Sequence, residues 1–274
     1  NSDNKHLIEI VHNVFLHISG SDLNDQVLGK AFKVIGSALG AADEKNLESL
    51  DLYPICQASV QLLQKQKRKE TQFEIIEFMC NAVYGSNKFS SILLDLGILD
   101  IFHQICHFAP EKLMSQALIT VSNFILSTGD TANYLSKSKF LNDSAQFLQS
   151  GTEKVKIEAF KLFDNIMYIE NVFYNASFAF DVLTNYNILE PLSEFLYLDE
   201  TDSESMTLVY RCLSLINSAI DLYTKNGREM PSPPIKMMLE ESNYERLQSL
   251  ADFVDESIRN LANIILKEVG KFIE

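Results

Sequence analysis

Apolar residues recur at helical spacing along most of the chain, as in the segments FEIIEF, FHQICHF and AFKLF. This pattern predicts helices at about 43–50, 53–64 and 69–83. The two stretches that follow in the sequence show the same order of two helices and a longer third helix. Pro54 is compatible with the start of the second helix, because N–H groups in the first helical turn have no intrahelical acceptor. The sequence therefore predicts units of three helices.

Four asparagines follow apolar stretches in similar surroundings, namely Asn81, Asn123, Asn165 and Asn217. The steps between them are 42 (123−81), 42 (165−123) and 52 (217−165) residues. These steps lie in or near the period of about 40 to 47 residues of armadillo and HEAT arrays. A single unit cannot cover its own apolar face, so successive units must stack. Because three helices per unit favour the armadillo pattern, we expect an all-α, armadillo-repeat superhelical solenoid.

Helix breakers and capping signals divide the chain into about six three-helix repeats of one armadillo domain. A break at KNGREMPSPP precedes the last repeat, and an acidic loop in the repeat before it accounts for the longer step to Asn217. Ser242 and Glu245 form a capping-box pattern, which predicts a helix start at Ser242. The first repeat is partial and five are complete, with approximate bounds 1–40, 41–86, 87–128, 129–168, 169–225 and 226–274.

Composition supports a helical fold and limits the alternatives. The 274 residues are 46% apolar and include only 10 Gly and 6 Pro, too few breakers for a β-rich fold. We expect no membrane span, because no uncharged apolar run reaches about 18 residues. The start NSDNKHLIEI lacks the layout of a secretion signal. Since the first residue is not Met, we expect the chain to be part of a longer protein.

The formal net charge of −14 indicates which partners to expect. An acidic surface repels phosphate backbones and anionic lipids and attracts basic peptides, so we expect protein partners and neither nucleic acid nor membrane. The cysteines lack the paired spacing of zinc sites and the density of a disulfide framework. We expect reduced core thiols at Cys56, Cys80, Cys106 and Cys212.

Segments of the later units resemble one armadillo family. VSNFILSTGD, KIEAFKLFDNIM and CLSLINSAIDLYTKNG are similar to third helices of the later repeats of importin-α, the adaptor that binds nuclear localisation signals. The C-terminal segment IKMMLEESNYERLQSLADFVDESIRNLANIILKEVGKFIE resembles the last repeat of that family. The resemblance spans most of the chain. It implies a non-catalytic adaptor of the cytoplasm and nucleus whose partners are cargo peptides, importin-β and the importin-α export receptor.

Importin-α holds basic peptides with a ladder of Trp and Asn on its third helices, each Trp one turn before its Asn. An indole face attracts a lysine side chain, and an Asn amide bonds the extended peptide backbone. This sequence has the Asn positions but contains no Trp. Where the family has Trp, it has Glu77, Ile119 and Lys161. A lysine there would repel a basic side chain, so the chain departs from the family pattern.

Steps of four, seven and eleven residues back from each Asn follow one face of its helix. Before Asn81 they give an acidic stripe suited to Lys or Arg, and before Asn165 they give a mixed set. We therefore expect a concave groove that binds an extended protein segment of basic or mixed charge near Asn81 to Asn165. The candidate peptide-binding residues are Asn81, Asn123, Asn165, Asn217, Glu70, Glu74, Glu77, Ile119, Glu158 and Lys161.

These signals also have structural interpretations. An Asn inside a helix can instead bond a neighbouring repeat, and the acidic stripe can be a solvated helix face. His103 and His107 lie one turn apart beside Cys106, but HQICH lacks the Glu of a zincin helix, so we expect no metal site. No phosphate loop or nucleophile elbow is present, and we expect neither enzyme activity nor a cofactor. The alternatives to an importin-α-like adaptor are a cytoplasmic armadillo scaffold for signalling, adhesion or cytoskeletal complexes, and a chaperone cofactor.

Overall fold

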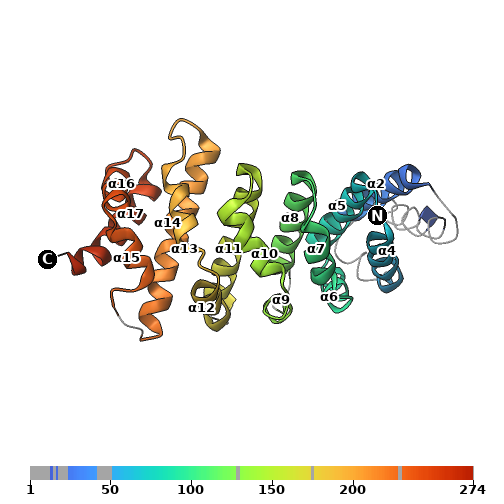
Figure 1. The fold of residues 1–274 in the computed structure, drawn as a ribbon, viewed down its shortest axis with the longest axis horizontal. Coiled ribbons are helices and arrows are strands. Elements are labelled where there is room, and N and C mark those ends of the chain that lie inside the picture. Colours follow the sequence, from blue (N-terminus) through green and yellow to red (C-terminus); the bar gives the residue numbers. More distant parts are fainter. Residues whose placement is uncertain are drawn as a thin grey trace. The chain divides into compact units, whose positions relative to one another are not determined.

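Every regular element in the described part of the chain is a helix (Figure 1). The computed structural model describes residues 13, 14, 17, 24–41, 51–127, 130–173, 176–227 and 230–273. The helix predicted at about 43–50 lies outside these residues.

The described residues form two compact units. The first contains the described residues up to Phe147 together with Gly151–Leu162. Its helices are α2 (Asp25–Ala41), α4 (Tyr53–Lys65), α5 (Lys69–Gly85), α6 (Asn87–Asp95), α7 (Ile98–Cys106), α8 (Glu111–Ser127), α9 (Thr131–Leu135), most of α10 (Phe140–Ser150) and the first half of α11 (Glu153–Phe173).

The second unit contains Leu148–Ser150 and the described residues from Phe163 onward. Its helices follow the second half of α11. They are α12 (Ala176–Asn185), α13 (Leu189–Ser193) with the 3₁₀ turn η1 (Glu194–Tyr197), α14 (Ser203–Lys225), α15 (Pro233–Leu239), α16 (Glu241–Ala251), α17 (Glu256–Val269) and the 3₁₀ turn η2 (Gly270–Phe272).

Local sequence signals set several helix boundaries. The Ser86 hydroxyl accepts from the N–H of Phe89 at 3.3 Å and caps α6. Asp202 caps α14 and Asp255 caps α17 through their carboxylates. Each cap satisfies N–H groups that the first helical turn leaves without a partner. These caps therefore fix where α6, α14 and α17 begin.

α6 and α7 meet at a sharp bend. No single helix in the described residues is long and apolar enough to cross a membrane, and α6 and α7 satisfy that measure only as a pair bent by 72°. Gly97 lies at the bend with φ of 75°, a left-handed conformation that glycine adopts without steric cost. Both helices direct apolar side chains into the core, among them Phe89 and Phe102.

Phenylalanines form the centre of the core in the first unit. Phe78 of α5 packs against Phe32 of α2 and Phe89 of α6, with ring centroids 5.2 and 5.6 Å apart. Phe102 of α7 similarly packs against Phe140 of α10 at 6.2 Å. All five rings are almost fully buried. Burial of this apolar surface stabilises each repeat only when its neighbour is in place.

Two glycines allow α2 and α5 to approach closely. A Cβ atom on Gly36 would lie 3.1 Å from Cα of Phe78, and one on Gly29 would lie 3.4 Å from Cγ of Glu74. The two glycines are seven residues apart, so they lie two turns apart on the same face of α2. The α2 backbone therefore rests directly on α5 at Gly36.

The structure changes one helix prediction in the second unit. The capping box is wrong, because α16 begins at Glu241 and has no side-chain cap, which places Ser242 inside the helix. Asn243 explains the difference, since its buried amide donates to the Met237 carbonyl at 3.0 Å and accepts from the Tyr197 hydroxyl at 3.1 Å. These bonds tie the start of α16 to α15 and η1.

Candidate functional site

The candidate site is the exposed face of the long helices α2, α5 and α8 in the first unit, called here the third-helix surface. Side chains about 40 residues apart in sequence touch across these helices, as Lys112 of α8 and Phe73 of α5 do. The three helices therefore run in the same direction and lie side by side (Figure 1). The third-helix surface consists of Lys30, Lys33 and Ser37 on α2, Glu70, Glu74, Glu77, Asn81 and Tyr84 on α5, and Lys112, Gln116, Ile119, Asn123 and Leu126 on α8.

The acidic stripe on α5 contains carboxylates in contrasting surroundings. Glu70 is fully exposed in the first turn, where its own backbone N–H and then Arg68, at 3.2 Å, lower its pKa. Burial, followed by repulsion from Glu77, raises the pKa of Glu74. Lys33 and Lys112 act on Glu74 in the opposite direction without reversing this shift.

A pocket of 340 Å³ opens beside this stripe, between α2 and α5. Oε2 of Glu74 is buried and has no hydrogen-bond partner among the described residues. A buried acceptor without a donor is energetically costly, so a donor from a bound molecule would be favourable here. The pocket is lined by Gly29, Lys30, Lys33, Arg68, Glu70, Thr71 and Glu74.

Asn81 is exposed near the end of α5. Its Nδ2 lies 3.6 Å from the place that a Cβ on Gly36 would occupy, so the amide lies against the α2 backbone. Within the described part of the chain, no hydrogen bond occupies this amide. Asn81 is therefore available to a main chain that crosses the surface.

Asn123 is half-buried on α8 and is partly used within the protein. Its Nδ2 donates to the carbonyl oxygen of Cys80 at 3.5 Å and contacts Sγ of Cys80 at 3.3 Å. This contact aligns Asn123 with the turn of α5 that carries Asn81. Ile119, one turn earlier, is also only partly buried. Asn123 thus joins neighbouring repeats, as the structural interpretation expected, and remains partly accessible at the surface.

Glu158 and Lys161 lie on the part of α11 that belongs to the first unit. The Lys161 ammonium donates to the Glu158 carboxylate at 3.0 Å, and both side chains are partly buried. The pair neutralises the charge that the sequence analysis expected to repel a basic ligand. These two residues therefore offer no net charge to a partner.

Asn165, in the second unit, contacts an arginine. Its Oδ1 accepts from Nη2 of Arg211 at 3.2 Å, while Nε of Arg211 donates to the adjacent Asp164 carboxylate at 2.5 Å. Burial raises the pKa of Asp164 even though the guanidinium favours its ionised form. Arg211 thus makes the contact with α11 that Asn123 makes with α5.

The sequence analysis did not find Arg211. It took Asn217 as the fourth asparagine of the series, but Asn217 lies six residues further along α14 and is flanked one turn earlier by buried Leu213. Arg211 is 46 residues from Asn165, a step closer to 42 than the 52 residues to Asn217. The step of 46 residues to Arg211 lies within the period of about 40 to 47 residues, whereas the step of 52 to Asn217 lies outside it.

The histidines make an inter-repeat contact. Nδ1 of His103 on α7 lies 2.5 Å from the buried carboxylate of Asp143 on α10. The His103 and His107 rings are 6.2 Å apart, and no cluster of three potential metal ligands exists within the described residues. Burial raises the pKa of the Cys106 thiol to about 12, which keeps it protonated.

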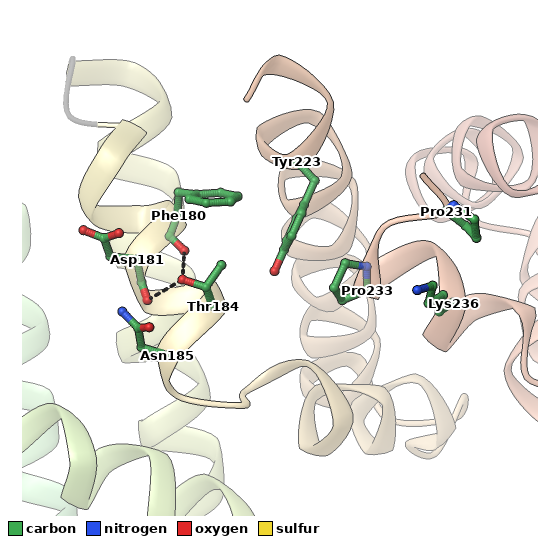
Figure 2. A pocket seen from close by; sticks show the side chains of 8 residues that line it. All are labelled: Phe180, Asp181, Thr184, Asn185, Tyr223, Pro231, Pro233 and Lys236. Carbon is green, nitrogen blue, oxygen red and sulfur yellow. Dashed lines mark hydrogen bonds between the residues drawn. The ribbon is translucent and has the colours of Figure 1, made fainter. Parts of the chain in front are cut away.

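A second pocket, of 560 Å³, lies in the second unit between α12, α14 and α15. Figure 2 shows Phe180 and Thr184 of α12 opposite Tyr223 of α14, with Pro233 beside the tyrosine. The Thr184 hydroxyl already donates to carbonyls of its own helix at 3.0 and 3.2 Å. Asp181, Asn185 and Lys236 also line the pocket, so it combines aromatic and proline groups with polar and charged ones.

Comparison with known proteins gives the fold. A scan against protein-family models and a search of curated proteins found no match. Among solved structures, the designed armadillo repeat protein YIII(Dq)4CqI is 18% identical with a TM-score of 0.69, covering 96% of this chain and 99% of its own. The designed armadillo repeat protein YIII(Dq.V1)4CPAF, solved in complex with the peptide (KR)4, is 17% identical with a TM-score of 0.66. The match covers 94% of this chain and 98% of the designed chain. The chain therefore has an all-α, armadillo-repeat fold.

Proposed function

We propose that this protein is a non-catalytic adaptor that binds an extended polypeptide segment on its third-helix surface. The main support is the placement of Asn81 and Asn123 at the same level of two adjacent parallel helices. Amides in that arrangement bond successive parts of an extended main chain and fix its direction. The designed armadillo protein in complex with (KR)4 lends support, because it holds a peptide on the same fold.

The charges on α5 favour a partner with basic residues. Glu74 has a buried oxygen without a donor, and Glu77 repels it. A cationic side chain between these carboxylates would relieve both costs. Because Lys33 and Lys112 flank the pair, we propose a segment of mixed rather than uniformly basic charge.

Nuclear transport is the more specific form of this proposal. Its support is the resemblance of the third helices and of the C-terminal segment to importin-α. It implies lysine-rich localisation signals as ligands, importin-β and the export receptor as partners, and residence in both cytoplasm and nucleus. A binding assay with a lysine-rich signal peptide tests it, because absence of binding together with binding of mixed-charge peptides would favour a scaffold instead.

Fluorescence anisotropy with labelled peptides of about ten residues tests the site. Replacing both Asn81 and Asn123 by Ala should weaken binding of a basic or mixed-charge peptide about tenfold or more, since each lost hydrogen bond contributes about 1 kcal/mol. The double variant Asn87→Ala and Asn142→Ala is the matched control, because both side chains are exposed on α6 and α10. Equal affinity of all three proteins for every peptide would refute the proposal.

Asn81→Ala alone separates binding from folding. The Asn123 amide bonds Cys80, so its loss also reduces stability. Asn81 makes no such bond among the described residues, and its replacement should leave the thermal unfolding midpoint unchanged. A weaker peptide complex at unchanged stability therefore locates the effect at the surface.

A further inference from the structure

Large apolar side chains are exposed next to the asparagines of the third-helix surface. Tyr84 is 83% exposed and lies three residues after Asn81, and Leu126 is 51% exposed and lies three residues after Asn123. Residues three apart share one face of a helix. On α11, Tyr168 has the same position relative to Asn165 and is 61% exposed. The repetition at equivalent positions distinguishes these residues from scattered surface hydrophobics.

The two apolar side chains of the first unit lie at the same level. The contact of Asn123 with Cys80 sets the register between α8 and α5. One turn beyond this contact, α8 carries Leu126 and α5 carries Tyr84. The C-terminal side of the two asparagines is therefore apolar.

The N-terminal side of the same asparagines is charged. α5 carries Glu77 and Glu74 in successive turns before Asn81. On α8, the Lys112 ammonium lies over the Phe73 ring, 3.6 Å from its centroid, and so is held close to α5. A chain crossing at the asparagines would have carboxylates on one side and apolar groups on the other.

In an extended chain, successive side chains point to opposite sides. We propose that the partner is an extended segment in which cationic residues alternate with apolar residues. The cationic side chains would approach Glu74 and Glu77, and the apolar ones would cover Tyr84 and Leu126. This inference rests on the proposed function, because it requires the main chain to lie along Asn81 and Asn123.

Three labelled peptides of eight residues test the alternation: one with Lys and Leu alternating, one with the same residues in two blocks, and (KR)4. The alternating peptide should bind about tenfold more tightly than the block peptide, because only its leucines can all reach the apolar side. Equal affinities for the alternating and block peptides would overturn the inference and leave the proposed function intact. Failure of all three peptides, and of the mixed-charge peptides used to test the site, to bind would instead count against the proposed function.

Variants assign the preference to particular side chains. Replacing Tyr84 and Leu126 by Ser should abolish the preference for alternation while (KR)4 binds as before. Asn81→Ala should weaken all three peptides. Tyr53→Ser is the matched control, because Tyr53 is also half-exposed but lies on α4. A preference for alternation that survives in the Tyr84 and Leu126 variant would overturn the inference. Circular dichroism verifies that each variant is folded.

Discussion

At the residue scale, Glu70 and Glu74 lie one turn apart on α5 but experience opposite surroundings. The helix N-terminus and Arg68 stabilise the charge of Glu70 and lower its pKa. Burial and Glu77 destabilise the charge of Glu74 and raise its pKa. A carboxylate that is unfavourable in the folded protein is a cost that a cationic ligand can remove.

Glu74→Gln should raise the thermal unfolding midpoint at pH 7. Because the folded pKa of Glu74 is raised, its ionisation reduces stability as the pH rises through that pKa, and Gln removes this loss. The gain should vanish below about pH 4.5, the ordinary pKa of the group, where Glu74 is neutral in both states. The same variant should bind basic peptides more weakly.

Glu70→Gln is the control of opposite sign. The lowered pKa of Glu70 means that its charge adds stability above the ordinary pKa, and that this contribution is lost as the pH falls through the folded value. The unfolding midpoint of this variant should therefore be slightly lower at pH 7. Differential scanning fluorimetry across pH measures both variants, and changes of the same sign would contradict the assignment.

Arg211→Ala should destabilise the protein by about 3 to 5 kcal/mol, because it leaves the buried Asp164 carboxylate without its cation. Replacing Asp164 by Leu and Arg211 by Met together should restore much of the stability, since neither charge then remains buried. Urea denaturation gives both values. A double variant as unstable as Arg211→Ala would show that packing, and not charge, governs this contact.

At the element scale, the register between parallel third helices positions the site. Gly36 allows α2 to rest on α5, and the Asn123 contact with Cys80 aligns α8 with α5. These contacts decide which turns of neighbouring helices lie level. The surface is thus a product of helix packing more than of any single helix.

Gly36→Ala should destabilise the protein relative to Gly29→Ala by about 1 to 3 kcal/mol, the usual cost of overpacking. The new Cβ at position 36 would lie 3.1 Å from the Phe78 backbone, which cannot move without shifting α5. At position 29 it would meet the flexible Glu74 side chain at 3.4 Å, and the higher helix propensity of Ala should prevail. Equal stabilities in urea would show that the α2 and α5 backbones can separate at no cost.

The sequence predicted helices best where local signals were unambiguous. Apolar periodicity and helix breakers located α4, α5 and α8, because their burial repeats at every turn. The start of α16 was missed because the long-range bond between Tyr197 and Asn243 overrides the local capping pattern. The repeat period located Asn81 and Asn123, but their partners depend on helix register, which no single segment encodes.

At the scale of the whole molecule, the net charge of −14 affects how partners arrive. An acidic protein attracts basic peptides over distances comparable to the screening length, which is about 10 Å at 0.1 M salt. Most of this negative charge lies outside the third-helix surface. On that surface, Lys33 and Lys112 offset part of the charge of Glu74 and its neighbours. Long-range attraction and local recognition therefore have different sources.

The association rate of a lysine-containing peptide should fall about tenfold between 50 and 500 mM NaCl, while its dissociation rate changes much less. Screening weakens the attraction of distant charges, whereas contacts at the surface stay desolvated. Stopped-flow anisotropy measures both rates. A peptide with Gln in place of Lys is the control and should show little salt dependence. A strong salt effect on dissociation alone would contradict this separation.

The position of Cys80 beneath the Asn123 amide has a practical consequence. Its thiol is buried, and burial raises its pKa, so an alkylating reagent can reach the reactive thiolate only when α5 and α8 move apart. The rate at which iodoacetamide labels Cys80 therefore reports how often that seam opens. A polypeptide that spans both helices should slow this labelling, which makes the native protein its own probe of occupancy.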